Sequence, residues 1–298
     1  MNTRFAGGTR PTELLRRSCV RTIALMHELM SRTKSANANQ FGKWFDSSTR
    51  HWSRVQSKHN ADSIEAQRAG TQDSKKWYRI VRGEQALSER GLQDLQSLFP
   101  DAVRYFDEGP DRLWEAMWGD VDSLWSICGA LVHAYEFPDP ARKIDKSTLS
   151  DPSLLELVTG PELSFEESLN NFEGSLLSYR QFGHEISLRD LSESIAFYRL
   201  HAAVNRLCKT DGVGAYRCVR LCLDDEGVSL TLKALGEHSS CIDIYETVSK
   251  ELADTEIRRL QEEPSYRESV GVTDFVGYAC NPAAFCSNEA RMEALQIG

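Results

Sequence analysis

Residues 62–100 read DSIEAQRAGTQDSKKWYRIVRGEQALSERGLQDLQSLFP, and the capping residues and glycines in this stretch predict short helices. Asp62 or Ser63 can cap the first helix, because a side-chain oxygen there accepts hydrogen bonds from free backbone amides. Gly70 closes this helix, since glycine tolerates the left-handed conformation that often follows a helix end. The stretch therefore begins with one short helix between a polar cap and a glycine.

The same signals predict two further short helices in this stretch. Asp73 or Ser74 caps a helix over residues 75–82, which Gly83 closes. Ser88 opens the third helix, which continues toward the end of the stretch. One face of the third helix carries leucines at three-residue spacing: Leu92, Leu95 and Leu98.

Helical periodicity continues on both sides of this stretch. Before it, apolar residues recur every three or four positions, so we predict helices from Pro11 to about Ser31 and from Phe41 toward His59. After it, residues 113–135 predict one long amphipathic helix. The proline-rich residues 138–161 are the expected connector. Further helices are predicted around residues 164–179 and 187–198, where Ser164 with Glu167 and, more weakly, Ser187 with Asp190 fit a capping box, and around residues 214–223 and 242–263.

One alternating apolar pattern, over residues 228–232, is compatible with a strand. A single strand would have no pairing partner in this sequence, so we expect a helix or an extended loop instead. The fold class predicted from these patterns is all-α, with short helices near the amino end and a larger helical domain after them.

Charge is distributed unevenly along the chain. Residues 1–90 contain 17 Lys or Arg against 8 Asp or Glu, a net charge of +9. Residues 91–298 contain 18 against 36, a net charge of −18. A basic segment joined to an acidic body can concentrate a polyanion at one end, as in many nucleic-acid binders. The alternative is that the two oppositely charged parts attract each other.

Composition favours a cytoplasmic globular protein. Of the 298 residues, 41% are hydrophobic and 27% are charged, and the apolar runs are too short for a membrane span. The eight cysteines are scattered, so we expect reduced thiols, with Cys218 and Cys222 buried rather than bound to zinc. The arginine-rich, acid-poor start also resembles an organelle transit peptide, and a basic helix is the preferred interpretation.

Motifs for catalysis and cofactors are missing from the sequence. There is no P-loop, no G-x-S-x-G nucleophile elbow and no HExxH pair, and Gly212-Val213-Gly214 lacks the third glycine of a dinucleotide site. We therefore predict a non-enzymatic protein without a metal or cofactor. An enzyme in the acidic domain stays open, because catalytic residues that meet only in space leave no local pattern.

Residues 62–100 resemble the helix-turn-helix of the Cro/phage-repressor family. In that family a small residue in the first helix lets the two helices cross closely and a glycine makes the turn, which would be Ala66 and Gly70 here. The segment from Gly83 to Ser88 and the leucines after it are similar to the family's following loop and helix. The resemblance implies sequence-specific binding of double-stranded DNA.

The resemblance also implies which residues contact DNA. It places the recognition helix at residues 74–81, with Trp77 and Ile80 directed inward. Residues at the start of such a helix reach base edges, and the cations after them hold phosphates. The nucleic-acid-binding residues implied in this way are Gln72, Ser74, Lys75, Lys76, Arg79 and Arg82.

The predicted organisation has three parts: a basic helix and linker over residues 1–38, a helix-turn-helix-like domain over 39–100, and an acidic helical domain over 101–298. The predicted function is transcription regulation through DNA, with the acidic domain serving self-association, a protein partner or sensing. The alternative is a protein-interaction module, antitoxin-like or a scaffold, in which the helix-turn-helix is only structural.

Overall fold

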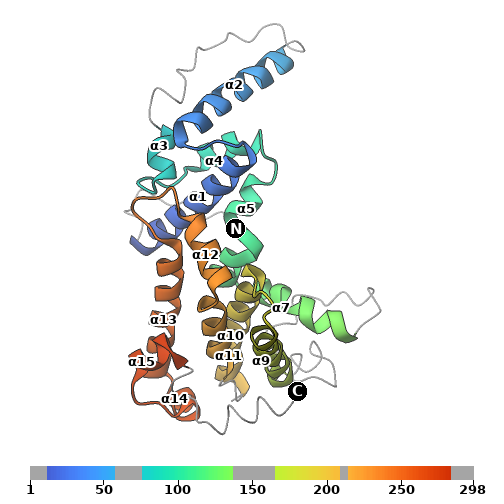
Figure 1. Cartoon of the computed structure of the whole chain (residues 1–298), viewed down its shortest axis with the longest axis vertical. Helices are drawn as coiled ribbons and strands as arrows, with labels where there is room; N and C mark the ends of the chain where they lie inside the picture. The colour runs from blue at the N-terminus through green and yellow to red at the C-terminus, as the bar shows by residue number, and fades with distance from the viewer. Residues whose placement is uncertain (1–11, 58–75, 137–164, 209–213, 283–298) are drawn as a thin grey trace. The chain divides into compact units, whose positions relative to one another are not determined.

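A computed structural model describes residues 12–57, 76–136, 165–208 and 214–282. Apart from one short 3₁₀ helix, every regular element within these ranges is an α-helix (Figure 1). The predicted all-α class is confirmed. No helix in the described ranges combines the length and the apolar character that crossing a membrane requires. The predicted helix over residues 63–69 and the connector over 138–161 lie outside the described residues.

The chain forms two compact units. Unit 1 contains residues 1–109 together with 232–244, and unit 2 contains residues 110–231 and 245–298. The sequence placed boundaries at residues 38 and 100, whereas this grouping unites the first two predicted segments and adds a segment from much later in the chain. Unit 1 carries 19 Lys or Arg against 14 Asp or Glu, and unit 2 carries 16 against 30.

Unit 1 is built around one apolar core, and α1 contributes several of the side chains buried in it. Leu25, Met26 and Leu29 of α1 are buried together with Phe41 and Leu95 from later helices. Burying such side chains stabilises the fold by about 1.5–3 kcal/mol each. The main helices of this unit are α1 (Thr12–Arg32), α2 (Ala38–Ser57), α3 (Lys76–Val81), α4 (Glu89–Gln96) and α5 (Ala102–Glu108).

Hydrogen bonds fix the segment between α3 and α4 in this core. The buried Thr22 hydroxyl of α1 accepts a hydrogen bond of 3.0 Å from the Leu87 amide. Ser88 caps α4 as predicted, because its hydroxyl accepts a hydrogen bond from the Gly91 amide at 3.1 Å. The path of the chain after α3 is thereby tied to α1.

Unit 2 is organised around α10, which contacts α6, α7 and α11. The capping box predicted at Ser187 and Asp190 is confirmed: the Ser187 amide donates to the Asp190 carboxylate at 2.7 Å, and the Asp190 amide donates to the Ser187 hydroxyl at 3.3 Å. The elements of this unit are η1 (Pro110–Arg112), α6 (Leu113–Trp118), α7 (Val121–Glu136), α9 (Phe165–Phe182), α10 (Leu188–Cys208), α11 (Gly214–Leu223), the first part of α12 (Glu226–Leu235), α13 (Ile244–Glu262) after its first residue, α14 (Pro264–Val270) and α15 (Phe275–Cys280).

The prediction of one helix over residues 113–135 is wrong. The chain leaves the helical conformation at Gly119, and α6 and α7 are separate helices. The Asp120 carboxylate accepts a hydrogen bond of 2.9 Å from the Ser123 amide, which is the capping contact that starts α7. Apolar periodicity alone did not reveal this break, because both helices bury residues with similar spacing.

Residues 228–232 belong to helix α12 and do not form a strand. This confirms the expectation of a helix or an extended loop, and the structure shows that it is a helix. Cys218 and Cys222 are both buried in unit 2, as predicted. Burial raises the pKa of Cys222 to about 12, so this thiol stays protonated at neutral pH. Both cysteines therefore serve as small apolar residues of the core.

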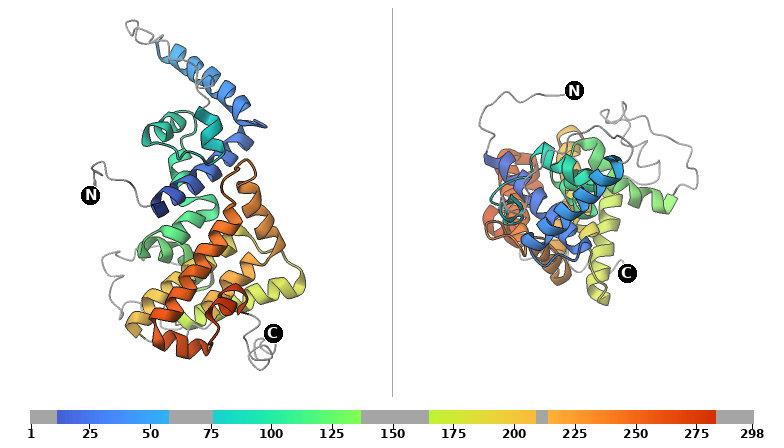
Figure 2. Two further views of the ribbon diagram at one scale, coloured as in Figure 1. Left: turned by 90° about the vertical axis from the view of Figure 1, so that its left-hand side faces the viewer. Right: turned by 90° about the horizontal axis from the view of Figure 1, so that it is seen from above.

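A buried polar network joins α10 and α13, which lie side by side in unit 2 (Figures 1 and 2). The fully buried Glu256 carboxylate accepts hydrogen bonds from the hydroxyls of Tyr198 at 2.7 Å and Tyr266 at 2.8 Å. Arg259 stacks on the Tyr266 ring, with its guanidinium carbon 3.6 Å from the ring centre. The same guanidinium contacts His201 Nδ1 at 2.9 Å. Polar pairing of this kind satisfies groups that burial would otherwise penalise.

Candidate nucleic-acid interface

Helix α3 has one face fixed in the core of unit 1. Trp77 and Ile80 are almost fully buried, as the sequence predicted for the inward side of this helix. The Trp77 ring packs edge-on against Phe41 and Phe45, with ring centres 5.1 and 4.9 Å away. Edge-to-face contacts at these distances are favourable for aromatic rings. The rotation of α3 about its own axis is therefore set by its buried face.

Gly83 ends α3 in the way the sequence predicted. Its φ angle is +76°, and the amides of Gly83 and Glu84 donate to the carbonyls of Ile80 and Arg79, each at 3.0 Å. A Cβ atom at this position would lie 2.7 Å from Ile23 Cδ1 of α1. Glycine is thus required both by the left-handed backbone and by the close approach to α1.

Replacing Gly83 with alanine is expected to lower the free energy of unfolding by about 2–3 kcal/mol, because left-handed strain and a steric contact add together. Gly271 is a matched control, since it has a φ of +70° and nothing within 4 Å of an added Cβ. Its replacement should cost about 1–2 kcal/mol from the backbone alone. Chemical denaturation of both variants tests the difference, and equal costs would refute the packing role of Gly83.

The opposite face of α3 carries the candidate DNA contacts. Arg79 is exposed, and it makes no ion pair within the described part of the chain. Tyr78 beside it is 43% exposed. Lys76 is partly buried, and its ammonium lies 5.0 Å from the centre of the Trp77 ring. The helix therefore presents the exposed guanidinium of Arg79, and the ammonium of Lys76, which packs against the Trp77 ring.

Arg82 is engaged more tightly than the other cations of this face. Its Nε atom lies 3.2 Å from Glu84 Oε1 and donates to the Ser240 hydroxyl at 3.0 Å. The guanidinium also donates to the Tyr78 hydroxyl and lies 4.9 Å from the centre of the Tyr78 ring. Glu84 therefore offsets part of the charge of Arg82, whereas Arg79 makes no ion pair within the described residues.

Three of the six residues implied by the family resemblance have no described position: Gln72, Ser74 and Lys75 lie outside the described residues, as do Ala66 and Gly70. Three cations of the helix predicted before residues 62–100, Arg50, Arg54 and Lys58, would broaden the basic surface, and their side chains are likewise not described. The described part of the interface is therefore Lys76, Arg79 and Arg82, which α3 and its end bring together.

Several other cations of unit 1 are balanced by acids. Arg32 forms a two-pronged contact with Asp101, at 2.9 and 2.8 Å, and it also pairs with Glu28 at 2.7 Å. Arg17 pairs with Glu13 at 2.6 Å. Exposed pairs of this kind contribute little to stability, but they reduce the charge that a polyanion meets. Arg79 differs from these paired cations, since it makes no ion pair within the described residues.

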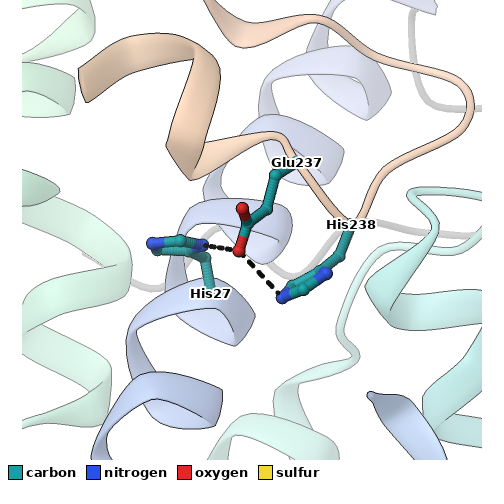
Figure 3. A group of neighbouring side chains, drawn as sticks. All are labelled: His27, Glu237 and His238. Carbon is teal, nitrogen blue, oxygen red and sulfur yellow. Dashed lines mark ion pairs between the residues drawn. The ribbon is translucent and has the colours of Figure 1, made fainter. Parts of the chain in front are cut away.

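The sequence missed a group of residues in unit 1 that could hold a metal ion. His27 of α1 lies beside Glu237 and His238, which follow α12, and the three potential ligand atoms lie within 4.8 Å of one another (Figure 3). Burial lowers the pKa of His27, while the nearby Glu237 carboxylate acts in the opposite direction. These residues are far apart along the chain, so no spacing rule for metal ligands reveals them.

Known proteins add no information on this interface. No protein-family model, curated protein or solved structure matches the chain. The resemblance to Cro/phage-repressor proteins depends only on the residues quoted for it, and function has to be argued from charge, exposure and packing.

Proposed function

We propose that unit 1 binds double-stranded DNA through α3 and that the protein regulates transcription. The observation that carries this proposal is Arg79: it is exposed and unpaired within the described residues, on a helix whose other face is locked by Trp77 and Ile80. A rigid helix with an outward guanidinium is suited to contact a phosphate or a guanine edge. In this proposal α3 is the recognition helix.

The distribution of charge supports the same proposal. Unit 1 has a net charge of +5 and unit 2 a net charge of −14. A polyanion is therefore attracted to unit 1 and repelled by unit 2. The acidic unit is left to serve self-association, a protein partner or sensing, and it is not part of the DNA surface.

The test is a charge reversal at Arg79, measured as binding to a fluorescent duplex of about two helical turns at low salt. Arg79→Glu is expected to weaken binding by about tenfold or more, because an attraction to phosphate becomes a repulsion. The control is Arg180→Glu on α9 of unit 2, which changes the net charge equally at another exposed arginine. It should alter affinity by about twofold at most.

Equal affinity of wild type and Arg79→Glu, with circular dichroism showing both folded, would remove α3 as the recognition helix. An equal loss in both variants would mean that only the net charge of the chain matters.

A protein-interaction module is the second candidate. The observation in its favour is that Glu84 and Ser240 engage Arg82, so part of the basic face is already satisfied within unit 1. This function predicts no retention of the wild-type protein on DNA even at low salt. The same binding experiment therefore separates the two candidates.

A further inference from the structure

Two histidines and one carboxylate converge in unit 1 at a point that the DNA proposal does not use (Figure 3). His27 Nδ1 lies 3.6 Å from Glu237 Oε1, and His238 Nε2 lies 3.2 Å from the same oxygen. The two imidazole rings are tilted by 37°, with centres 6.1 Å apart. One carboxylate oxygen is therefore directed between two ring nitrogens.

These distances suit a tetrahedral zinc ion. Zinc binds imidazole nitrogen and carboxylate oxygen at about 2.0–2.2 Å, so neighbouring ligand atoms in a tetrahedron lie about 3.4 Å apart. The two nitrogen-to-oxygen distances, 3.2 and 3.6 Å, fall on either side of that value. The two histidine nitrogens lie within 4.8 Å of each other, so a movement of at most about 1.4 Å would bring them to the same spacing.

Hydrogen bonding in the structure leaves one ligand atom unsatisfied. His27 Nδ1 is buried and has no hydrogen-bond partner within the described residues, because its 3.6 Å separation from Glu237 is too long. A buried nitrogen without a partner is unfavourable, and a metal ion would supply one. The Glu237 side chain is 53% exposed, so solvent has a path to the site and a water molecule can complete the coordination.

We propose that His27, Glu237 and His238 bind a divalent zinc ion, with water in the fourth position. Two imidazoles and one carboxylate form a ligand set that zinc favours. The ion would join α1 to the residues that follow α12 and so act as a clamp within unit 1.

The clamp would also act on the end of α3. Ser239, next to His238, donates from its hydroxyl to the Arg82 carbonyl at 3.1 Å, and Ser240 accepts from the Arg82 side chain at 3.0 Å. Zinc would therefore stabilise the segment that contacts α3 immediately before Gly83. The zinc proposal does not depend on DNA binding, and either can fail without the other.

The experiment titrates the metal-stripped full-length protein with zinc chloride in a calorimeter. Because the chain has seven histidines and eight cysteines, binding is compared between variants rather than counted in wild type alone. His27→Ala and Glu237→Gln should each lose one zinc equivalent or bind it at least about tenfold more weakly. The control, His184→Ala, removes an exposed histidine of unit 2 and should bind zinc as wild type does.

A second measurement uses cobalt(II) in place of zinc, since a tetrahedral cobalt site absorbs visible light with an intensity that octahedral cobalt lacks. The absorption should appear with wild type and with His184→Ala, and it should be missing with Glu237→Gln. Glu237 is a surface residue, so this variant keeps the test valid even if His27→Ala fails to fold. Identical zinc isotherms for wild type and Glu237→Gln would overturn the proposal.

Discussion

Replacing Glu256 with alanine is expected to lower the free energy of unfolding of unit 2 by about 3–5 kcal/mol. The substitution leaves the buried hydroxyls of Tyr198 and Tyr266 without their acceptor. It also removes a carboxylate beside Arg259, whose side chain is almost fully buried. Each unsatisfied buried group contributes about 1–3 kcal/mol to the loss. Denaturation of the variant, followed by near-ultraviolet circular dichroism, measures the effect.

Glu256→Gln is the matched control, because glutamine keeps the shape of the side chain and cannot ionise. Burial raises the pKa of Glu256 above its ordinary value of 4.5, an effect that the Tyr198 and Tyr266 hydroxyls partly oppose. The folded state therefore binds this proton more tightly than the unfolded state. The contribution of this proton to the stability of the folded state is fully present below about pH 4.5. It is lost as the pH rises through the pKa that Glu256 has in the folded state.

The stability of wild type relative to Glu256→Gln should therefore decrease as the pH rises above 4.5. Comparing the two proteins at each pH cancels the titration of groups that they share. A difference that stays constant, or that increases with pH, would show that Glu256 is not held in the environment described for it.

Trp77→Ala is expected to destabilise unit 1 by about 3–5 kcal/mol. The Trp77 ring is 2% exposed and fills the space between Phe41 and Phe45, so its removal leaves a cavity in the core. Because this ring also fixes the rotation of α3, DNA binding should be lost together with the folded structure. Thermal denaturation of the variant measures the loss of stability.

Tyr78→Ala provides the comparison for this prediction, since the adjacent Tyr78 side chain is 43% exposed. Removal of that ring should cost about 1 kcal/mol or less, as for most surface substitutions. A similar cost at both positions would mean that α3 is not anchored through its tryptophan.

Local signals in the sequence predicted much of the fold. Ser88 and the Ser187–Asp190 pair marked helix starts correctly, because capping contacts form between residues three positions apart. Gly83 marked the end of α3, since its left-handed conformation is itself a local property. The same reasoning did not predict α5, whose seven residues follow Pro100 closely and give too short a pattern.

Contacts between distant parts of the chain were not predictable in this way. The grouping of residues 232–244 with unit 1 depends on contacts such as that of Ser239 with Arg82, for which no local pattern exists. The convergence of His27 with Glu237 has the same cause. The sequence also treated all the cations of α3 as equivalent, whereas Glu84 offsets the charge of Arg82 and leaves Arg79 open.

The salt dependence of DNA binding tests the central claim, the cationic face of α3, most directly. For two or more phosphate contacts, the logarithm of the association constant should fall with the logarithm of salt concentration at a slope of about −2 or steeper. Arg79→Glu should make this slope shallower by about 1. Failure of wild type to bind duplex DNA at low salt, or the same slope for both proteins, would contradict the account.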